Sequence, residues 1–155
     1  MRDIFLSVFK IGYVKIAPGT FASVFATIIA TPILYFSESI LFMLSILIAV
    51  IATKQIDIYE QNNASHDAKH IVIDELIGVW IALSIAGFGI LNIILSLIFF
   101  RIYDIWKPSI IRKIDKNIKG GIGVVADDII AGLIGGISSL LVIVILQKLG
   151  FSIEI

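Results

Sequence analysis

The chain has 155 residues, 59% of them hydrophobic and 15% charged, and its mean hydropathy is +1.06. This composition leaves too little polar surface for an ordinary water-soluble globule, and it excludes disordered, collagen-like and coiled-coil classes. The 12 basic and 12 acidic residues cancel and cysteine is absent, which excludes an overall basic field for nucleic acid, a disulfide framework and cysteine-dependent catalysis. At this length we expect a single domain over residues 1–155.

The N-terminal segment has too few apolar residues to act as a secretory signal. Only residues 4–9 are uncharged between Asp3 and Lys10. A signal-peptide core needs about 7 to 15 such residues before a cleavage site. We therefore expect the N-terminus to be retained.

Four uncharged stretches follow, at residues 16–37, 39–53, 76–100 and 129–147. They are longer than ordinary strands, so they predict helices. Because a membrane-spanning helix needs about 20 apolar residues, three are long enough, and the second is short unless it tilts little or borrows Lys54 and Gln55. We expect the first two stretches to form a hairpin turned near Glu38, with a kink at Pro32. Small residues at three- and four-residue spacings in the last stretch favour close helix packing.

The stretch at 76–100 decides the topology. A straight helix of this length spans about 37 Å and would separate Asp74 from Asp104 on opposite membrane faces. Folding back at Gly87 and Gly89 would instead give two short arms, shielded by neighbouring helices, and would bring both polar flanks to one side. Nearly all lysines and arginines then lie in the cytoplasm, as the positive-inside tendency favours. We therefore predict the hairpin.

Two of the four polar clusters lie in the first half of the chain. At residues 15–23, Pro and Gly form a turn before a helix, and Lys15 and Thr20 lie beside the free N–H groups of its first turn. This pattern fits either a simple helix start or a phosphate site. At residues 67–78, Asp74 and Glu75 open the third stretch. They fit either capping charges favoured by the helix dipole or ligands of a metal ion at a membrane boundary.

The other two clusters flank the last polar block. On a helix, Arg101, Asp104 and Lys107 share one face, which fits either an ion-paired helix end in the membrane interface or part of a site. At residues 120–132 a glycine loop leads to Asp127 and Asp128, either of which is suited to cap the last helix. The glycines match neither a dinucleotide fingerprint nor a P-loop.

In the hairpin topology all four clusters meet at one membrane face. As many as six carboxylates then lie beside basic residues, an arrangement that suits a metal–phosphate complex, and hard oxygen ligands favour Mg²⁺ over zinc. We interpret His66 and His70 as bystanders in a polar loop. The carboxylates are Asp67, Asp74, Glu75, Asp104, Asp127 and Asp128, and the basic residues are Lys15, Arg101 and Lys107.

The order of the clusters and the residue types within them resemble the phosphatidylglycerophosphatase A family over about residues 10–135. Two departures, at Ala22 and Ala126, touch no charged position. The matching motifs are Lys15-x-Ala17-Pro18-Gly19-Thr20-x-x-Ser23, then Asp67 followed by Ile71-Val72-Ile73-Asp74-Glu75-x-x-Gly78, then Phe100-Arg101-x-x-Asp104-x-x-Lys107-Pro108, and last Gly121-x-Gly123-Val124-x-x-Asp127-Asp128-x-x-Ala131-Gly132.

This resemblance implies an all-α, membrane-embedded helical bundle with phosphatase activity. It implies a Mg²⁺-dependent enzyme that removes the terminal phosphate of phosphatidylglycerophosphate and yields phosphatidylglycerol. It also implies a multi-pass protein of the bacterial cytoplasmic (inner) membrane, with its active site facing the cytoplasm. A phospholipid substrate agrees with the charge pattern, since its acyl chains stay in the bilayer while its phosphate reaches the interface where the clusters meet.

Our hypothesis for the site assigns a role to each charged residue. Mg²⁺ is expected to activate water or to orient an Asp nucleophile, and the sequence leaves both open. The expected metal ligands are Asp74, Glu75, Asp104, Asp127 and Asp128, of which all but Glu75 are also expected to be catalytic. The expected phosphate ligands are Lys15, Thr20, Arg101 and Lys107.

Two other function classes fit the apolar composition. A small transporter or ion-binding helical protein without phosphatase activity would use its acids along a permeation path. That function predicts charges distributed through the membrane depth, whereas the uncharged stretches contain none. A non-catalytic bundle would only pack against partners.

Overall fold

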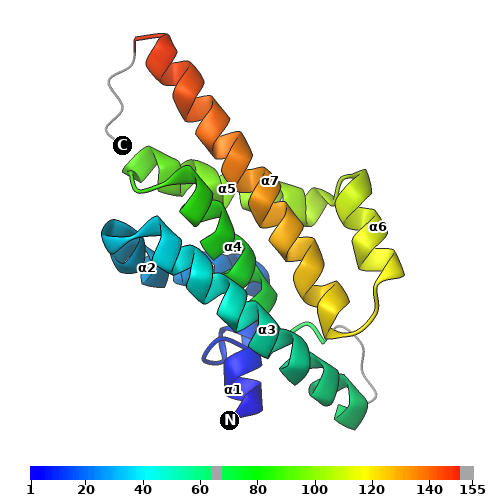
Figure 1. Cartoon of the computed structure of the whole chain (residues 1–155). Coiled ribbons are helices and arrows are strands. Elements are labelled where there is room, and N and C mark those ends of the chain that lie inside the picture. The colour runs from blue at the N-terminus through cyan, green and yellow to red at the C-terminus, as the bar shows by residue number, and fades with distance from the viewer. Residues whose placement is uncertain (64–67, 151–155) are drawn as a thin grey trace.

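The computed structural model describes residues 1–63 and 68–150, and within these ranges the regular structure is entirely helical. Figure 1 shows the helices crossing one another as a bundle, which confirms the predicted all-α class. In chain order the elements are α1 (Arg2–Leu6), the 3₁₀ turn η1 (Ile11–Tyr13), α2 (Pro18–Phe36), α3 (Glu38–Asn63), α4 (Ile73–Ala86), α5 (Ile90–Trp106), α6 (Ser109–Asn117) and α7 (Gly121–Lys148).

Three helices in the described part of the chain, α2, α3 and α7, are long and apolar enough to cross a membrane. The predicted α2–α3 hairpin is confirmed, because α2 ends at Phe36 and α3 begins at Glu38 after a single extended residue. As expected, α3 continues past its uncharged stretch through Lys54 and Gln55. α2 continues as one helix through Pro32, and the kink expected there stays a prediction.

The stretch at 76–100 folds back as a helical hairpin, so the straight-helix alternative is wrong. Gly87 and Gly89 turn the chain with φ angles of 83° and 152°, which side chains rarely tolerate. Asn92 closes the turn by donating from its amide to the carbonyl oxygen of Ala86 at 2.6 Å. The arms, of 14 and 17 residues, are longer than the uncharged stretch predicts because each extends into its charged flank.

α4 forms the centre of the bundle and packs against α2, α3, α5 and α7 (Figure 1). Ten of its residues are buried, which a 14-residue helix needs if it is to lie in a membrane without spanning it. Trp80 ties α4 to α2 by donating its indole N–H to the carbonyl oxygen of Ala26 at 2.9 Å. The shielding that we predicted for the short arms is therefore confirmed for α4.

α7 approaches α4 and α5 closely because glycines lie at the crossings. A Cβ atom at Gly132 would lie 2.4 Å from the carbonyl oxygen of Gly78 in α4, and one at Gly135 would lie 2.9 Å from the backbone nitrogen of Phe100 in α5. These distances are shorter than any ordinary carbon contact, so backbone packs on backbone. The small-residue pattern that predicted close packing is confirmed.

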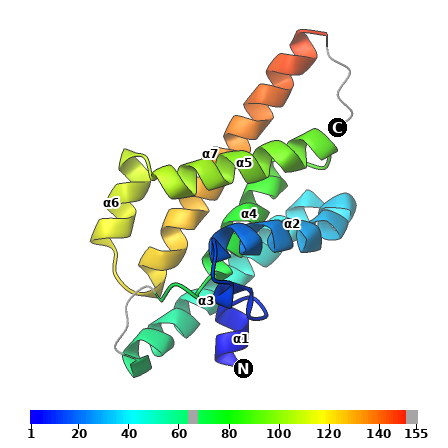
Figure 2. The ribbon, with the colours of Figure 1, turned by 180° about the vertical axis from the view of Figure 1, so that it is seen from behind.

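Two contacts fix the polar end of the bundle. Asp57 of α3 accepts a hydrogen bond from the backbone N–H of Gly121 at 2.7 Å and so satisfies a donor at the start of α7. The backbone N–H of Val72 donates to the carbonyl oxygen of Leu6 at 2.9 Å, which holds α1 against the entry to α4. Figure 2, seen from behind, shows α6 carrying the chain from the end of α5 to the start of α7.

Candidate functional site

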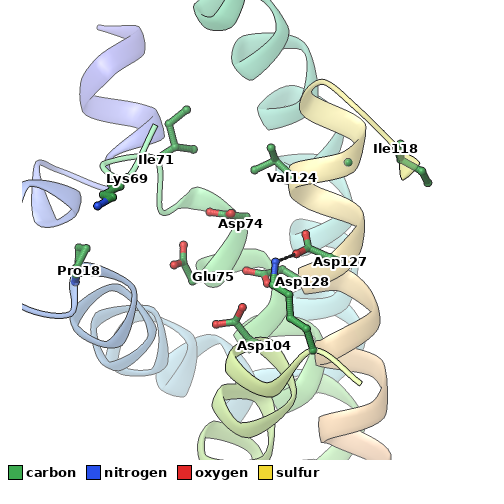
Figure 3. A pocket seen from close by; sticks show the side chains of 12 residues that line it. Pro18, Lys69, Ile71, Asp74, Glu75, Asp104, Ile118, Val124, Asp127 and Asp128 are labelled. Carbon is green, nitrogen blue, oxygen red and sulfur yellow. Dashed lines mark hydrogen bonds and ion pairs between the residues drawn. The ribbon is translucent and has the colours of Figure 1, made fainter. Parts of the chain in front are cut away.

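A cavity of about 430 Å³ lies where the first turns of α2, α4 and α7 meet the end of α5. Figure 3 shows its acidic side chains directed toward a shared space. All four polar clusters of the sequence contribute to its wall, as the hairpin topology predicts. The lining residues are Pro18, Lys69, Ile71, Asp74, Glu75, Asp104, Lys107, Ile118, Gly123, Val124, Asp127 and Asp128.

Three carboxylates form the acidic centre of this cavity. One side-chain oxygen from each of Asp74, Glu75 and Asp128 lies within 4.8 Å of the other two. Asp74 and Glu75 occupy the first turn of α4, yet neither side chain caps the helix, and Asp128 is 3% exposed. We refer to these three residues as the acid triad.

The capping interpretation of the last acidic pair is wrong. α7 begins at Gly121, so Asp127 and Asp128 lie inside the helix rather than before it. The start of α7 packs closely on α3, because a Cβ atom at Gly121 would lie 2.1 Å from the carbonyl oxygen of Thr53. Both carboxylates are thereby held on a rigid element, with side chains that are almost fully buried.

The electrostatics of the acid triad favour a bound cation. Burial raises the pKa of Asp74 well above its usual range, and the neighbouring charges of Glu75 and Asp128 raise it further. Burial also raises the pKa of Glu75, against a hydrogen bond with Asp74 that lowers it. Within the described part of the chain, Asp74 Oδ1, Glu75 Oε2 and Asp128 Oδ2 are buried without a hydrogen-bond partner. Oxygen atoms in this state fit the ligand set of a hard divalent cation.

Lys107 reaches the cavity through an unusual backbone conformation. It ends α5 with a left-handed φ of 44°, and its Nζ lies 2.6 Å from Asp127 Oδ2. The predicted helical face of Arg101, Asp104 and Lys107 therefore holds only for the first two, because Pro108 disfavours helical geometry at the residue before it. A strained residue beside a cluster of charges is typical of a functional site.

Arg101 does not line the cavity, but it pairs with Asp104, which does, and it connects α5 with α2. Its Nη1 forms an ion pair with Asp104 Oδ2, and its Nη2 lies 3.4 Å from the hydroxyl of Thr20. A Cβ atom at Gly19 would lie 2.2 Å from Glu75 Oε1 and 3.3 Å from Arg101 Nη1. The first turn of α2 thus packs directly on the charged groups, and a side chain at position 19 would displace the end of Glu75.

Arg101 and Thr20 are not residues of the cavity wall, and the remaining site candidates also fall outside it. Among the described residues, Lys15 is exposed ahead of α2 and does not line the cavity. Asp67 and His66 lie outside the described residues. His70 stacks on Tyr13, with ring centroids 4.9 Å apart, and its Nε2 lies 3.7 Å from Asp3. It therefore has a packing role, in agreement with its interpretation as a bystander.

Lys69 is a cavity residue that the sequence reasoning did not assign to the site. Its side chain lines the wall on the same side as Pro18, across from Glu75 (Figure 3). The signal was its position five residues before Asp74, in a cluster already selected for its acids. A search for cations next to candidate metal ligands would have found it, because phosphate sites need both charges.

The arrangement suits chemistry on a phosphate group. Lys69, Lys107 and the guanidinium of Arg101 place positive charge around the acid triad, and charged donors of this kind bind phosphate oxygens strongly. A divalent cation held by carboxylates beside such donors is the arrangement that phosphoryl-transfer sites use.

Comparisons with known proteins agree with this geometry. The family model described as phosphatidylglycerophosphatase A matches residues 4–143. Phosphatidylglycerophosphatase A of Escherichia coli (strain K12) is 36% identical over 134 residues, covering 81% of this chain and 74% of that protein. The Haemophilus influenzae protein of the same name is 30% identical and covers 81% and 78%.

A third relative has a name with a different headgroup. The Bacteroides thetaiotaomicron protein named "Putative phosphatidylinositol-3-phosphatase" is 31% identical over 132 residues and covers 81% of this chain and 82% of its own length. No solved structure matches the chain. From the family match and these relatives, the chain belongs to the phosphatidylglycerophosphatase A family and is a phosphoric monoester hydrolase.

Proposed function

We propose that the chain hydrolyses the terminal phosphate monoester of phosphatidylglycerophosphate and yields phosphatidylglycerol in a reaction that depends on Mg²⁺. The observation that carries the proposal is the acid triad, with its unpartnered oxygens, inside a cavity that basic residues also line. The names of the Escherichia coli and Haemophilus influenzae relatives support this substrate. We infer a bacterial cytoplasmic membrane location, because the apolar helices suit a bilayer and the Escherichia coli relative is bacterial.

Asp74, Glu75 and Asp128 are the proposed primary ligands of Mg²⁺. Asp104 and Asp127 also lie in the cavity wall, and each is paired with a basic residue. We therefore assign these two residues to the part of the site between the metal and the phosphate group. When bound, the cation supplies Lewis-acid stabilisation of phosphate oxygens and lowers the pKa of a bound water. Its binding would also neutralise three closely spaced carboxylates that otherwise repel one another.

The phosphate group of the substrate is proposed to bind Arg101, Lys107 and Lys69. The guanidinium carries five N–H donors, so Arg101 can hold phosphate oxygens while it remains paired with Asp104. The hydroxyl of Thr20, which lies beside Arg101, is proposed as a further phosphate ligand. Lys15 is exposed before α2, and we propose it as a phosphate ligand on the basis of the sequence motif alone. The attacking group is either water or an aspartate of the site, and trapping of an aspartyl phosphate distinguishes them.

The cavity is proposed to face the cytoplasm. Arg112, Lys113 and Lys119 lie in or next to α6, beside the cavity end of the bundle, and basic loops favour the cytoplasmic side. Because the chain has no cysteine, a single Lys113→Cys substitution gives a unique thiol. We expect an impermeant maleimide to label it in inside-out vesicles and not in intact cells, and the reverse result would contradict this orientation.

Removal of the divalent cation tests the proposed chemistry. Purified protein should release phosphate from phosphatidylglycerophosphate with Mg²⁺ and lose at least about 99% of that activity in excess EDTA. Re-addition of Mg²⁺ should restore the activity. Full activity in EDTA would exclude the metal, and no release under any condition would favour the transporter or the non-catalytic bundle.

The choice of lipid headgroup needs a separate comparison. Phosphatidylinositol 3-phosphate should be assayed beside phosphatidylglycerophosphate because one relative carries that substrate in its name. We expect at least a tenfold higher kcat/KM for phosphatidylglycerophosphate. A preference for the inositol lipid would keep the phosphatase chemistry and change the substrate.

Substitution of Gly19 by Ala should weaken the metal site without unfolding the protein. The added methyl group would meet the end of the flexible Glu75 side chain, which can move aside and so leave the acid triad. Because displaced ligands and their supports typically cost 10- to 100-fold in metal affinity, the Mg²⁺ concentration for half-maximal activity should rise by about that factor.

The control for Gly19 lies on the same helix. Val24, which is 44% exposed on α2, can be replaced by Ala without touching the cavity wall. Titration of activity with Mg²⁺ should give the wild-type curve for Val24→Ala and a shifted curve for Gly19→Ala. Equal curves for all three proteins would show that Glu75 does not bind the metal.

A further inference from the structure

We propose that a groove on the outer face of α5 binds one acyl chain of the lipid substrate, and that Arg101 marks the passage from this groove to the acid cavity. The inference rests on the proposed function and adds to it the route by which the lipid approaches. It concerns a surface outside the cavity wall, so it can fail while the phosphatase assignment stands.

The groove has a volume of about 510 Å³ and follows the last turns of α5. Ile98, Ile102 and Ile105 are 47%, 45% and 71% exposed, so their side chains form an open apolar surface. Trp106, also largely exposed, stands at the end of the helix, where an indole ring is suited to a membrane interface. The lining residues are Leu97, Ile98, Arg101, Ile102, Ile105 and Trp106.

Within the described part of the chain, Arg101 is the one charged residue of the groove lining, and it links the groove with the cavity through Asp104. Its side chain borders the groove, while its guanidinium pairs with Asp104, a residue of the cavity wall. A long side chain of this type commonly lays its methylene groups along apolar surface and presents its charge at the polar end. The position therefore fits the junction of a phospholipid, where an apolar chain meets an anionic phosphate.

A second apolar pocket competes for the same role, and the structure favours the groove. That pocket, of about 340 Å³, lies between α1, α2, α3 and α4 and includes Phe5, Phe9 and Trp80. Among the residues that the structure describes, none with a charged side chain lines it. Its α4 residues Ile73, Leu76 and Trp80 share a face at helical spacing that differs from the face of Asp74 and Glu75. A chain bound there would have α4 between itself and the acid triad.

Acyl-chain photocrosslinking provides a direct test that needs no turnover. The probe is phosphatidylglycerophosphate with a diazirine in one acyl chain, added to the full-length Asp128→Asn protein in vesicles so that the lipid is not consumed. Phosphatidylcholine with the same chain measures non-specific contact with lipid. We expect labelling within residues 97–106 to exceed the phosphatidylcholine value at least fivefold. Equal labelling by the two lipids, or labelling of Phe5 and Phe9 in place of α5, would overturn the proposal.

Filling the groove provides the kinetic counterpart. Ile102→Trp puts a bulky apolar side chain into the groove, whereas Ile94→Trp adds the same side chain at a site 49% exposed on the same helix, outside the groove lining. We expect Ile102→Trp to raise KM for the long-chain lipid about tenfold with kcat nearly unchanged, and Ile94→Trp to match the wild type. Equal kinetics in the two variants, or a fall in kcat with KM unchanged, would contradict acyl-chain binding at this groove.

The two readouts separate this inference from the proposed function. Specific labelling of α5 in a protein that releases no phosphate would keep the lipid groove and reject the phosphatase. Phosphate release with labelling elsewhere would keep the phosphatase and reject the groove.

Discussion

Asp128→Asn and Asp74→Asn should each reduce phosphate release by roughly 10³-fold or more while the protein remains folded. Asn keeps the shape of the side chain but removes the negative charge that binds a cation, and loss of one electrostatic element of a preorganised site costs about this much. The two residues belong to the acid triad and come from different helices. Each substitution therefore removes a proposed ligand of the same site from a different helix. Phosphate release from phosphatidylglycerophosphate at saturating Mg²⁺ is the measurement.

Asp74→Asn should not lower stability in the absence of metal, although it lowers activity. The raised pKa of Asp74 means that the folded protein disfavours the ionised carboxylate, so at neutral pH its neutral replacement relieves repulsion within the triad. The thermal midpoint in EDTA should therefore equal or exceed that of the wild type. Glu38→Gln, an exposed acid at the start of α3, is the control for both measurements. Near-normal activity of both Asn variants would refute the assignment of the acid triad.

Gly132→Ala should destabilise the bundle and reduce activity together. Its methyl group would lie 2.4 Å from the backbone oxygen of Gly78, and neither helix backbone can move aside alone. Overpacking of this kind costs typically about 1–3 kcal/mol, and α7 must shift away from α4. Because Asp128 and Asp74 lie on these two helices, each about one turn before the contact, the shift separates triad oxygens that are now within 4.8 Å. Thermal unfolding in detergent and the phosphate assay measure the two effects.

Ile137→Ala is the matched control for the helix crossing. Ile137 lies on the same helix and is 51% exposed, so its truncation removes lipid-facing surface and leaves the contact with α4 intact. We expect its activity to equal that of the wild type. If Gly132→Ala behaved like this control, the backbone contact between α4 and α7 would not set the geometry of the site.

The charge pattern by itself predicted the topology and the meeting of the acids. A 25-residue uncharged stretch with Gly87 and Gly89 at its middle, flanked by basic blocks that favour one side, is sufficient to predict a hairpin. Asp74 and Asp104 then have to lie at the same end. The helical lengths were less well predicted, since α4, α5 and α7 all continue into charged residues that have buried partners or face the cavity.

The sequence determined which residue types gather at the polar end of the bundle, because uncharged helices long enough for a bilayer leave every charge at their ends. Only the tertiary structure decided how those charges pair. It brought oxygens of Asp74, Glu75 and Asp128 within 4.8 Å of one another and paired Asp104 with Arg101 and Asp127 with Lys107. It also placed Lys69 in the cavity wall and left Lys15 exposed. Hydropathy and residue spacing determine at which end of a helix a charged side chain lies. Pairing depends on helix rotation, which is set where α4 and α5 pack against the glycines of α7, and on the left-handed backbone of Lys107, which places its side chain beside Asp127.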